Sequence, residues 1–182
     1  MFSHLEKHKW TAAFISGLLF IILSSPIAYK GTDYLGSFLK QRTVDWSGRP
    51  SYLGLALHGV VFAAITRGLM AWKCMDGKLG YSPSQNQNYH AIARGLIFAL
   101  LSSTYAYQTT SKTITPLVAS NAERLPLDSP ARIASPLGSA TPTGLILHAL
   151  VFTIVIRFTL DYDATTEGFN PFKKASWVKK RK

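Results

Sequence analysis

The chain has 182 residues, 47% of them hydrophobic, a share near the globular average that does not by itself separate soluble from membrane proteins. Its formal net charge of +11 fits nucleic acid, a membrane surface or an acidic partner, because phosphates and lipid headgroups attract the same basic side chains. The single cysteine, Cys74, excludes an internal disulfide framework and a site with several thiolate ligands.

The apolar residues gather in four blocks, and nearly all Lys, Arg, Asp and Glu lie between or beyond these blocks. Each block is close to the roughly 20 residues that a helix needs to cross a bilayer. This distribution predicts an all-α integral membrane protein with four transmembrane helices. The predicted spans are residues 10–29, 52–72, 90–107 and 142–160.

The segments between the blocks, at 30–51, 73–89 and 108–141, are rich in Gly, Pro, Ser, Asn or charge and are predicted to be loops. The last of them carries too many prolines for a long helix. Lys and Arg are more frequent on the side of the membrane that would hold both termini, so both termini are predicted to face the cytosol.

The chain contains an internal repeat. At a shift of 78 residues, GLLFIILSSPIAYKGT from Gly17 matches GLIFALLSSTYAYQTT from Gly95. At a shift of 90 residues, GLALHGVVFAAITR from Gly54 matches GLILHALVFTIVIR from Gly144. Polar residues are costly in a bilayer, so the recurrence of Ser-Ser, Tyr, His and Arg in the same order favours duplication over chance.

The repeat divides the chain into a first two-helix hairpin at 1–80, a second at 81–163 and a basic tail at 164–182. Each hairpin crosses the membrane twice, so both copies have the same orientation. The two hairpins are therefore expected to be parallel repeats, related by an axis along the membrane normal.

His58 and His148 occupy equivalent places in the two copies. Facing each other, they would form a proton-binding pair or a metal site. Two histidines without a nearby carboxylate make a poor metal site, which favours a structural role in which each bonds to a neighbouring helix. No metal or cofactor is predicted. The residues predicted to pack helices together are Ser24, Ser25, His58, Ser102, Ser103 and His148.

Arg67 and Arg157 follow the two histidines by nine positions and so lie on roughly the opposite helix face. They are expected at lipid headgroups, with pore lining as the alternative. The same role is expected for Arg94 and for Lys179, Lys180, Arg181 and Lys182 of the tail, where a topology anchor is favoured over nucleic-acid binding.

Tyr29, Tyr107, Trp10 and Trp72 lie near the predicted span ends, where aromatic residues commonly anchor a protein in the membrane interface. No P-loop, HExxH motif or nucleophile elbow is present, and no enzymatic activity is predicted.

The hairpin GLLFIILSSPIAYKGT followed by LGLALHGVVFAAITRGLM resembles small two-span membrane proteins encoded by large icosahedral DNA viruses of algae and protists. The resemblance covers both hairpins but neither the loops nor the tail, and the second copy has Thr104 in place of Pro26. The residues that carry it are Ser24, Ser25, Pro26, Tyr29, His58, Phe62 and Arg67.

This resemblance implies a component of the virion internal membrane, or a minor capsid protein that ties the lipid layer to the shell. Membrane lipids are then its partners, together with capsid or membrane proteins that contact the 108–141 loop and the basic tail. Two alternatives come from other classes: a small ion or solute channel, or an accessory subunit of an organelle membrane complex. No acidic residue lies in the body of a span, which favours a structural role over a conduction pathway.

Overall fold

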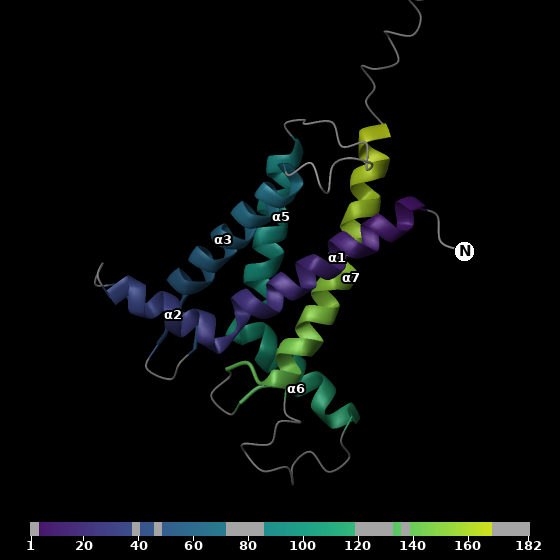
Figure 1. Cartoon of the computed structure of the whole chain (residues 1–182). Coiled ribbons are helices and arrows are strands. Elements are labelled where there is room, and N and C mark those ends of the chain that lie inside the picture. Colours follow the sequence, from purple (N-terminus) through teal and green to yellow (C-terminus); the bar gives the residue numbers. More distant parts are fainter. Residues whose placement is uncertain are drawn as a thin grey trace, which may run out of the picture.

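The computed structural model describes residues 4–37, 41–45, 49–71, 86–118, 133–135 and 139–168. Over these residues the fold is helical, and the extended pairing consists of two isolated bridges, Val44 with Pro50 and Ala134 with Ala140. The helices are α1 (His4–Ser24), α2 (Pro26–Gly36), α3 (Tyr52–Ala71), α5 (Asn86–Leu101), α6 (Thr104–Val118) and α7 (Pro142–Gly168) (Figure 1).

Two of the described helices are long and apolar enough to cross a membrane. The qualifying stretches are Tyr52–Leu69 in α3 and Pro142–Leu160 in α7, with 18 and 19 residues. The pair α1 and α2 provides a third candidate if its 55° bend is counted within one span. Helix α5 has only 16 residues, short of the roughly 20 that a bilayer requires, so no single long helix covers the predicted span at 90–107.

The predicted spans at 10–29 and 90–107 are each interrupted at their Ser-Ser pair. In the first, Pro26 is the first residue of α2, and the Ala28 amide donates to Ser25 Oγ over 3.2 Å, which caps the new helix. In the second, the Ala106 amide donates to Ser103 Oγ, also over 3.2 Å, although Thr104 stands in place of the proline. A serine cap is therefore common to both interruptions, whereas the proline is not.

The loops predicted at 30–51 and 108–141 both begin as helix, which corrects their boundaries. Helix α2 continues to Gly36, and α6 continues to Val118 with Pro116 in its last turn. Tertiary contacts stabilise both short helices, because each buries a tyrosine, Tyr29 in α2 and Tyr107 in α6. The propensities of the isolated segments did not show this.

The helix pairs that pack most closely join the two predicted hairpins. Helix α1 crosses α7, and α3 lies beside α5, whereas α1 with α3 and α5 with α7 make less extensive contact (Figure 1). Small residues allow both close approaches. Gly17 of α1 faces Thr153 and Ala149 of α7, and Gly95 of α5 faces the backbone of Gly59 in α3.

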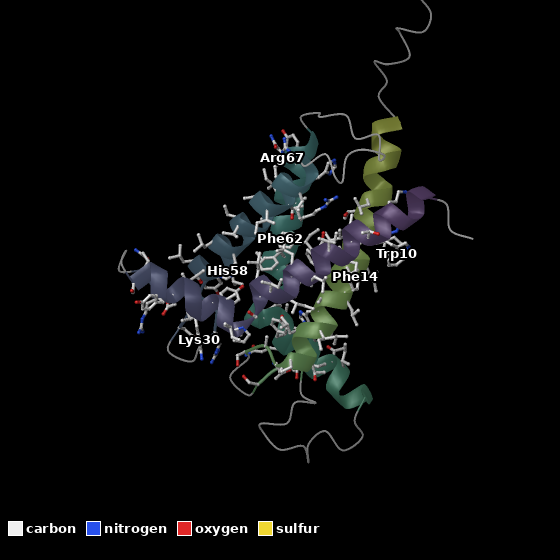
Figure 2. The ribbon with its side chains drawn as sticks, viewed as in Figure 1. Trp10, Phe14, Lys30, His58, Phe62 and Arg67 are labelled. Atoms are coloured by element: carbon white, nitrogen blue, oxygen red, sulfur yellow. The ribbon has the colours of Figure 1, made fainter. Side chains whose placement is uncertain are left out.

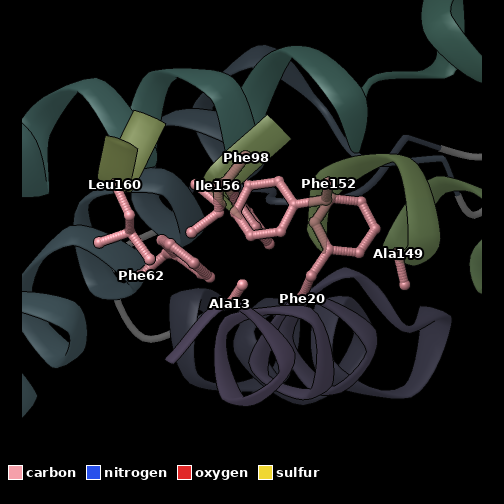
Figure 3. Close-up of a cluster of buried hydrophobic side chains, with 8 residues drawn as sticks. All are labelled: Ala13, Phe20, Phe62, Phe98, Ala149, Phe152, Ile156 and Leu160. Atoms are coloured by element: carbon pink, nitrogen blue, oxygen red, sulfur yellow. The ribbon is translucent and has the colours of Figure 1, made fainter. Parts of the chain in front are cut away.

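Four buried phenylalanines fill the centre, one each from α1, α3, α5 and α7 (Figure 3). Phe20 packs against Phe98 and Phe152 with ring centroids 5.3 and 5.0 Å apart. Phe62 packs against the same two rings at 4.9 and 5.2 Å. These edge-to-face and stacked contacts connect all four long helices in one cluster.

The outer surface is largely apolar while polar side chains are buried. On α3, Val60 and Leu57 are exposed, whereas His58 and Thr66 are buried. On α7, Leu150 and Phe158 are exposed, whereas His148 is buried. This is the reverse of a soluble protein and fits a protein surrounded by lipid.

Candidate functional site

The first histidine site consists of Leu23, Tyr29, Thr32 and His58. The Nδ1 atom of His58 lies 2.7 Å from the Leu23 carbonyl oxygen, and its Nε2 atom lies 2.9 Å from Thr32 Oγ1. The ring stacks on Tyr29 with centroids 4.1 Å apart. A carbonyl only accepts hydrogen bonds, so Nδ1 is the protonated nitrogen.

The interruption after Ser24 creates this site. The last carbonyls of an α-helix have no partner within the helix, so the end of α1 leaves the Leu23 carbonyl available. The Nδ1 atom of His58 in α3 donates to this carbonyl, and the Nε2 atom bonds to Thr32 of α2. The site thus joins α1, α2 and α3 where the chain bends.

The second histidine site consists of Leu101, Tyr107, Thr110 and His148. The His148 Nδ1 atom lies 2.7 Å from the Leu101 carbonyl oxygen, Nε2 lies 3.1 Å from Thr110 Oγ1, and the ring stacks on Tyr107 at 4.1 Å. All four residues are at the positions that the sequence alignment pairs with the first site. This site joins α5, α6 and α7.

The two tyrosines extend from these sites toward the serine pairs of the opposite half. Tyr29 Oη donates to Ser102 Oγ over 3.5 Å, and Tyr107 and Ser24 lie along the same small cavity. This cavity of about 10 Å³ lies between the two tyrosines, lined in part by Ser24, Ser102 and Thr104. That volume is about the space of one water molecule, so the cavity is not a channel.

Both histidines use both ring nitrogens within their own half of the chain. In the part of the chain that the structure describes, no three His, Cys, Asp or Glu residues gather as a metal site would require. The hydrogen bonds of both histidines to neighbouring helices are those that a structural role requires. Their hydroxyl partners are the threonines Thr32 and Thr110.

The four serines fall into two kinds. Ser24 and Ser102 are buried at the ends of α1 and α5 and line the small cavity. Ser25 and Ser103 are part-buried and cap α2 and α6 through Ala28 and Ala106. Their predicted role in helix packing applies most directly to the buried pair.

The three arginines of the predicted spans occupy different environments. Arg67 is part-exposed, and its Nε donates to Asn88 Oδ1 over 2.8 Å, which connects the end of α3 to the start of α5. It lies at the opposite end of the molecule from Lys30 (Figure 2). Arg157 is buried, with its guanidinium carbon 5.4 Å from the centre of the Trp10 ring, and Arg94 is also buried.

Arg94 and Arg157 thus expose little surface to a surrounding bilayer, whereas Arg67 is part-exposed. The headgroup role of all three stays a prediction. Lys179, Lys180, Arg181 and Lys182 lie outside the described residues, as does Trp72.

Sequence reasoning placed Tyr29 and Tyr107 in the membrane interface, but each is only 2% exposed and packs on a histidine. The interface prediction is wrong for them because stacking draws both rings inward. Trp10, at 45% exposed, is open as expected. Thr32 and Thr110 were not predicted as site residues. Their recurrence at paired positions of the repeat is the signal that could have identified them.

No protein-family model, curated protein or solved structure matches the chain. We infer function from the contacts of its own residues.

Proposed function

We propose that this chain is a structural integral membrane protein that crosses the bilayer four times as two tandem, parallel two-helix hairpins. The observation that carries the proposal is that His58 and His148 are both fixed within their own half by a carbonyl and a threonine. These polar groups of the apolar helices stabilise bends in the chain and are not arranged along a path for a solute.

Matched contacts support two copies of one hairpin. The two histidine sites agree in all four residues, in both hydrogen-bond partners and in the stacking distance of 4.1 Å. The bridges Val44–Pro50 and Ala134–Ala140 lie at paired positions. The serine caps before α2 and α6 are paired as well. Apolar composition alone does not produce repeated polar contacts.

The filled centre argues against a channel. An ion or polar solute leaving water needs its lost hydration replaced along the whole path. Here four phenylalanine rings occupy the middle of the helices, and the cavity between Tyr29 and Tyr107 measures about 10 Å³. A structural role requires no such path.

We place this membrane component in a virion, in the internal membrane or as a minor capsid protein, on the strength of the viral resemblance of its hairpins. In this setting the segment 108–141, which begins as helix α6, and the basic tail contact capsid or other membrane proteins on opposite sides of the bilayer. Both termini then lie on the cytosolic side. The net charge of +11 suits a protein held against acidic lipid headgroups.

A flux assay separates a structural protein from a channel. The full chain is reconstituted in liposomes, insertion is verified by flotation, and proton and potassium flux are compared with those of empty liposomes. We expect no additional flux from the wild type or from the His58→Phe and His148→Phe variants. Flux through the wild type that both histidine variants abolish would contradict the structural role.

Particle composition tests the virion setting separately. Mass spectrometry of purified particles should find the chain in stoichiometric amount and released only by detergent. Deleting residues 117–136 or the tail from residue 171 should reduce its incorporation, because those segments provide the aqueous surfaces. Absence from particles would remove the virion setting and leave the membrane role standing.

A further inference from the structure

An apolar groove of about 530 Å³ lies between α5 and α7, which pack less closely than α3 and α5. Ala93, Ile97 and Phe158 line it, so its walls are mainly hydrocarbon and aromatic. Ala93 and Phe158 are exposed, and the groove therefore opens to whatever surrounds the helices. Its volume is in the range of ligand pockets.

Basic side chains lie along the α5 wall of the groove. Arg94 lines it and is only 6% exposed, and His90 lies one turn earlier on the same helix. Both residues also interact with other groups of the protein. A guanidinium has five N–H donors in a planar fork, so one guanidinium can hold an internal partner and a phosphate oxygen together.

The groove lies where the two halves of the chain differ. The position paired with Ala93 is Ile15, and the position paired with Arg94 is Ser16. The first half thus has a larger side chain in place of the alanine and has no cation. The histidine sites are the same in both halves, whereas Ala93 and Arg94 distinguish the second half from the first.

We propose that this groove binds one anionic phospholipid, with an acyl chain along Ala93, Ile97 and Phe158 and the phosphate at Arg94. Apolar walls match the hydrocarbon, and the guanidinium fork matches phosphate oxygens in charge and geometry. The part-exposed mouth allows a lipid to enter from the bilayer. This inference rests on the membrane location proposed above.

The test is lipid retention by the full chain. The protein is inserted into vesicles of phosphatidylcholine containing one part in five of phosphatidylglycerol, recovered by flotation, extracted in mild detergent and analysed for bound lipid. We expect the ratio of phosphatidylglycerol to phosphatidylcholine in the bound lipid to be about five times the ratio in the membrane, the preference typical of one basic residue at an anionic surface.

Three variants locate the effect. Arg94→Ser introduces the residue of the paired position and should bring the enrichment close to the bulk share. Ala93→Trp keeps Arg94 but fills the groove from an exposed position, and it should lower total retained lipid. Lys30→Ser is the control, because it removes one positive charge at an exposed position of α2 outside the groove and should retain the enrichment.

Wild-type enrichment in both folded groove variants would overturn the proposal. An equal loss in Lys30→Ser would also overturn it, because it would indicate a diffuse charge effect. A wild-type chain that does not float with vesicles would contradict the membrane location as well. These failures are distinguishable because flotation is measured before lipid retention.

Discussion

At the scale of single residues, the hydrogen bonds of two histidines define the bends of the chain. Each ring donates a hydrogen bond to a carbonyl that has no partner within its own helix, at the end of α1 or α5. Its other nitrogen bonds to a threonine of the helix that follows, α2 or α6. A carbonyl without a partner in an apolar environment is costly, so each histidine stabilises the interruption that gives rise to its site.

Removing the threonine hydroxyls should weaken both sites to a similar degree. Thr32→Val and Thr110→Val keep the side-chain shape and leave the histidine Nε2 atom unpaired. Each should lower the free energy of unfolding by about 1 kcal/mol. SDS-induced unfolding of the full chain in detergent micelles measures the loss.

Thr113→Val is the control for this pair. Thr113 is exposed and donates to the Thr109 carbonyl of its own helix over 3.0 Å, so its replacement should be nearly neutral. A loss at Thr113 equal to that at Thr110 would indicate a general effect of hydroxyl removal in α6.

At the scale of elements, a serine cap restarts the helix after each interruption. Pro26 has the fixed backbone angle suited to the first residue of α2, and Thr104 is first in α6. The two interruptions are alike although their first residues differ. The first position of such a helix therefore accepts either proline or threonine. A proline in the interior of α6 should be destabilising.

Thr104→Pro should change the free energy of unfolding by less than about 0.5 kcal/mol, because the first amide of a helix has no internal partner. Thr109→Pro, at an exposed position of the same helix, should cost about 3 kcal/mol by removing an internal hydrogen bond. Circular dichroism and SDS unfolding give helix content and stability. Equal costs would show that the start of α6 differs from the start of α2.

Close approach of α3 and α5 depends on glycine. A Cβ added at Gly95 would lie 2.7 Å from the Gly59 carbonyl oxygen and 3.0 Å from the Ala63 Cβ atom. Gly95→Ala should therefore push the helices apart and lower stability by about 1–3 kcal/mol.

Gly68→Ala in the same helix pair is the matched control, since a Cβ there meets nothing within 4 Å. It should raise stability by about 0.5–1 kcal/mol through its greater helix propensity. The same unfolding assay measures both variants. A stabilising Gly95→Ala would show that α3 and α5 are further apart than the structure places them.

At the scale of the whole molecule, the two halves interlock. The closest pairs, α1 with α7 and α3 with α5, each take one helix from either half, and the phenylalanine cluster needs all four long helices. Neither half completes its packing alone. The close packing of α1 must therefore wait for α7, the last of the described helices.

Crossing four times places the successive loops on alternating sides of the membrane. In a Cys74→Ser background, single cysteines at Ser82 and Lys179 should react with an impermeant maleimide from one side, and cysteines at Arg42 and Asn121 from the other. Labelling of intact and opened vesicles measures this. All four on one side would contradict four spans. Asn121 and Lys179 on the same side would indicate that the segment between them crosses the membrane an even number of times or not at all.

The sequence by itself determined the helical class, the apolar segments and the residues that recur. These properties are local, because the length of an apolar run and the cost of polar groups in lipid are visible along the chain. The alignment also paired every member of the two histidine sites before their contacts were known.

Only the tertiary structure decided how those residues are used. Tyr29 lies inside and not in the interface because it stacks on His58, 29 positions further along the chain. The Leu23 carbonyl is available to His58 because α1 ends just after it, and the pattern of side chains along the sequence does not show where that helix ends. Likewise, α1 packs on α7 in preference to α3 because Gly17 meets Ala149 and Thr153, and complementarity between distant surfaces is not a local property of the sequence.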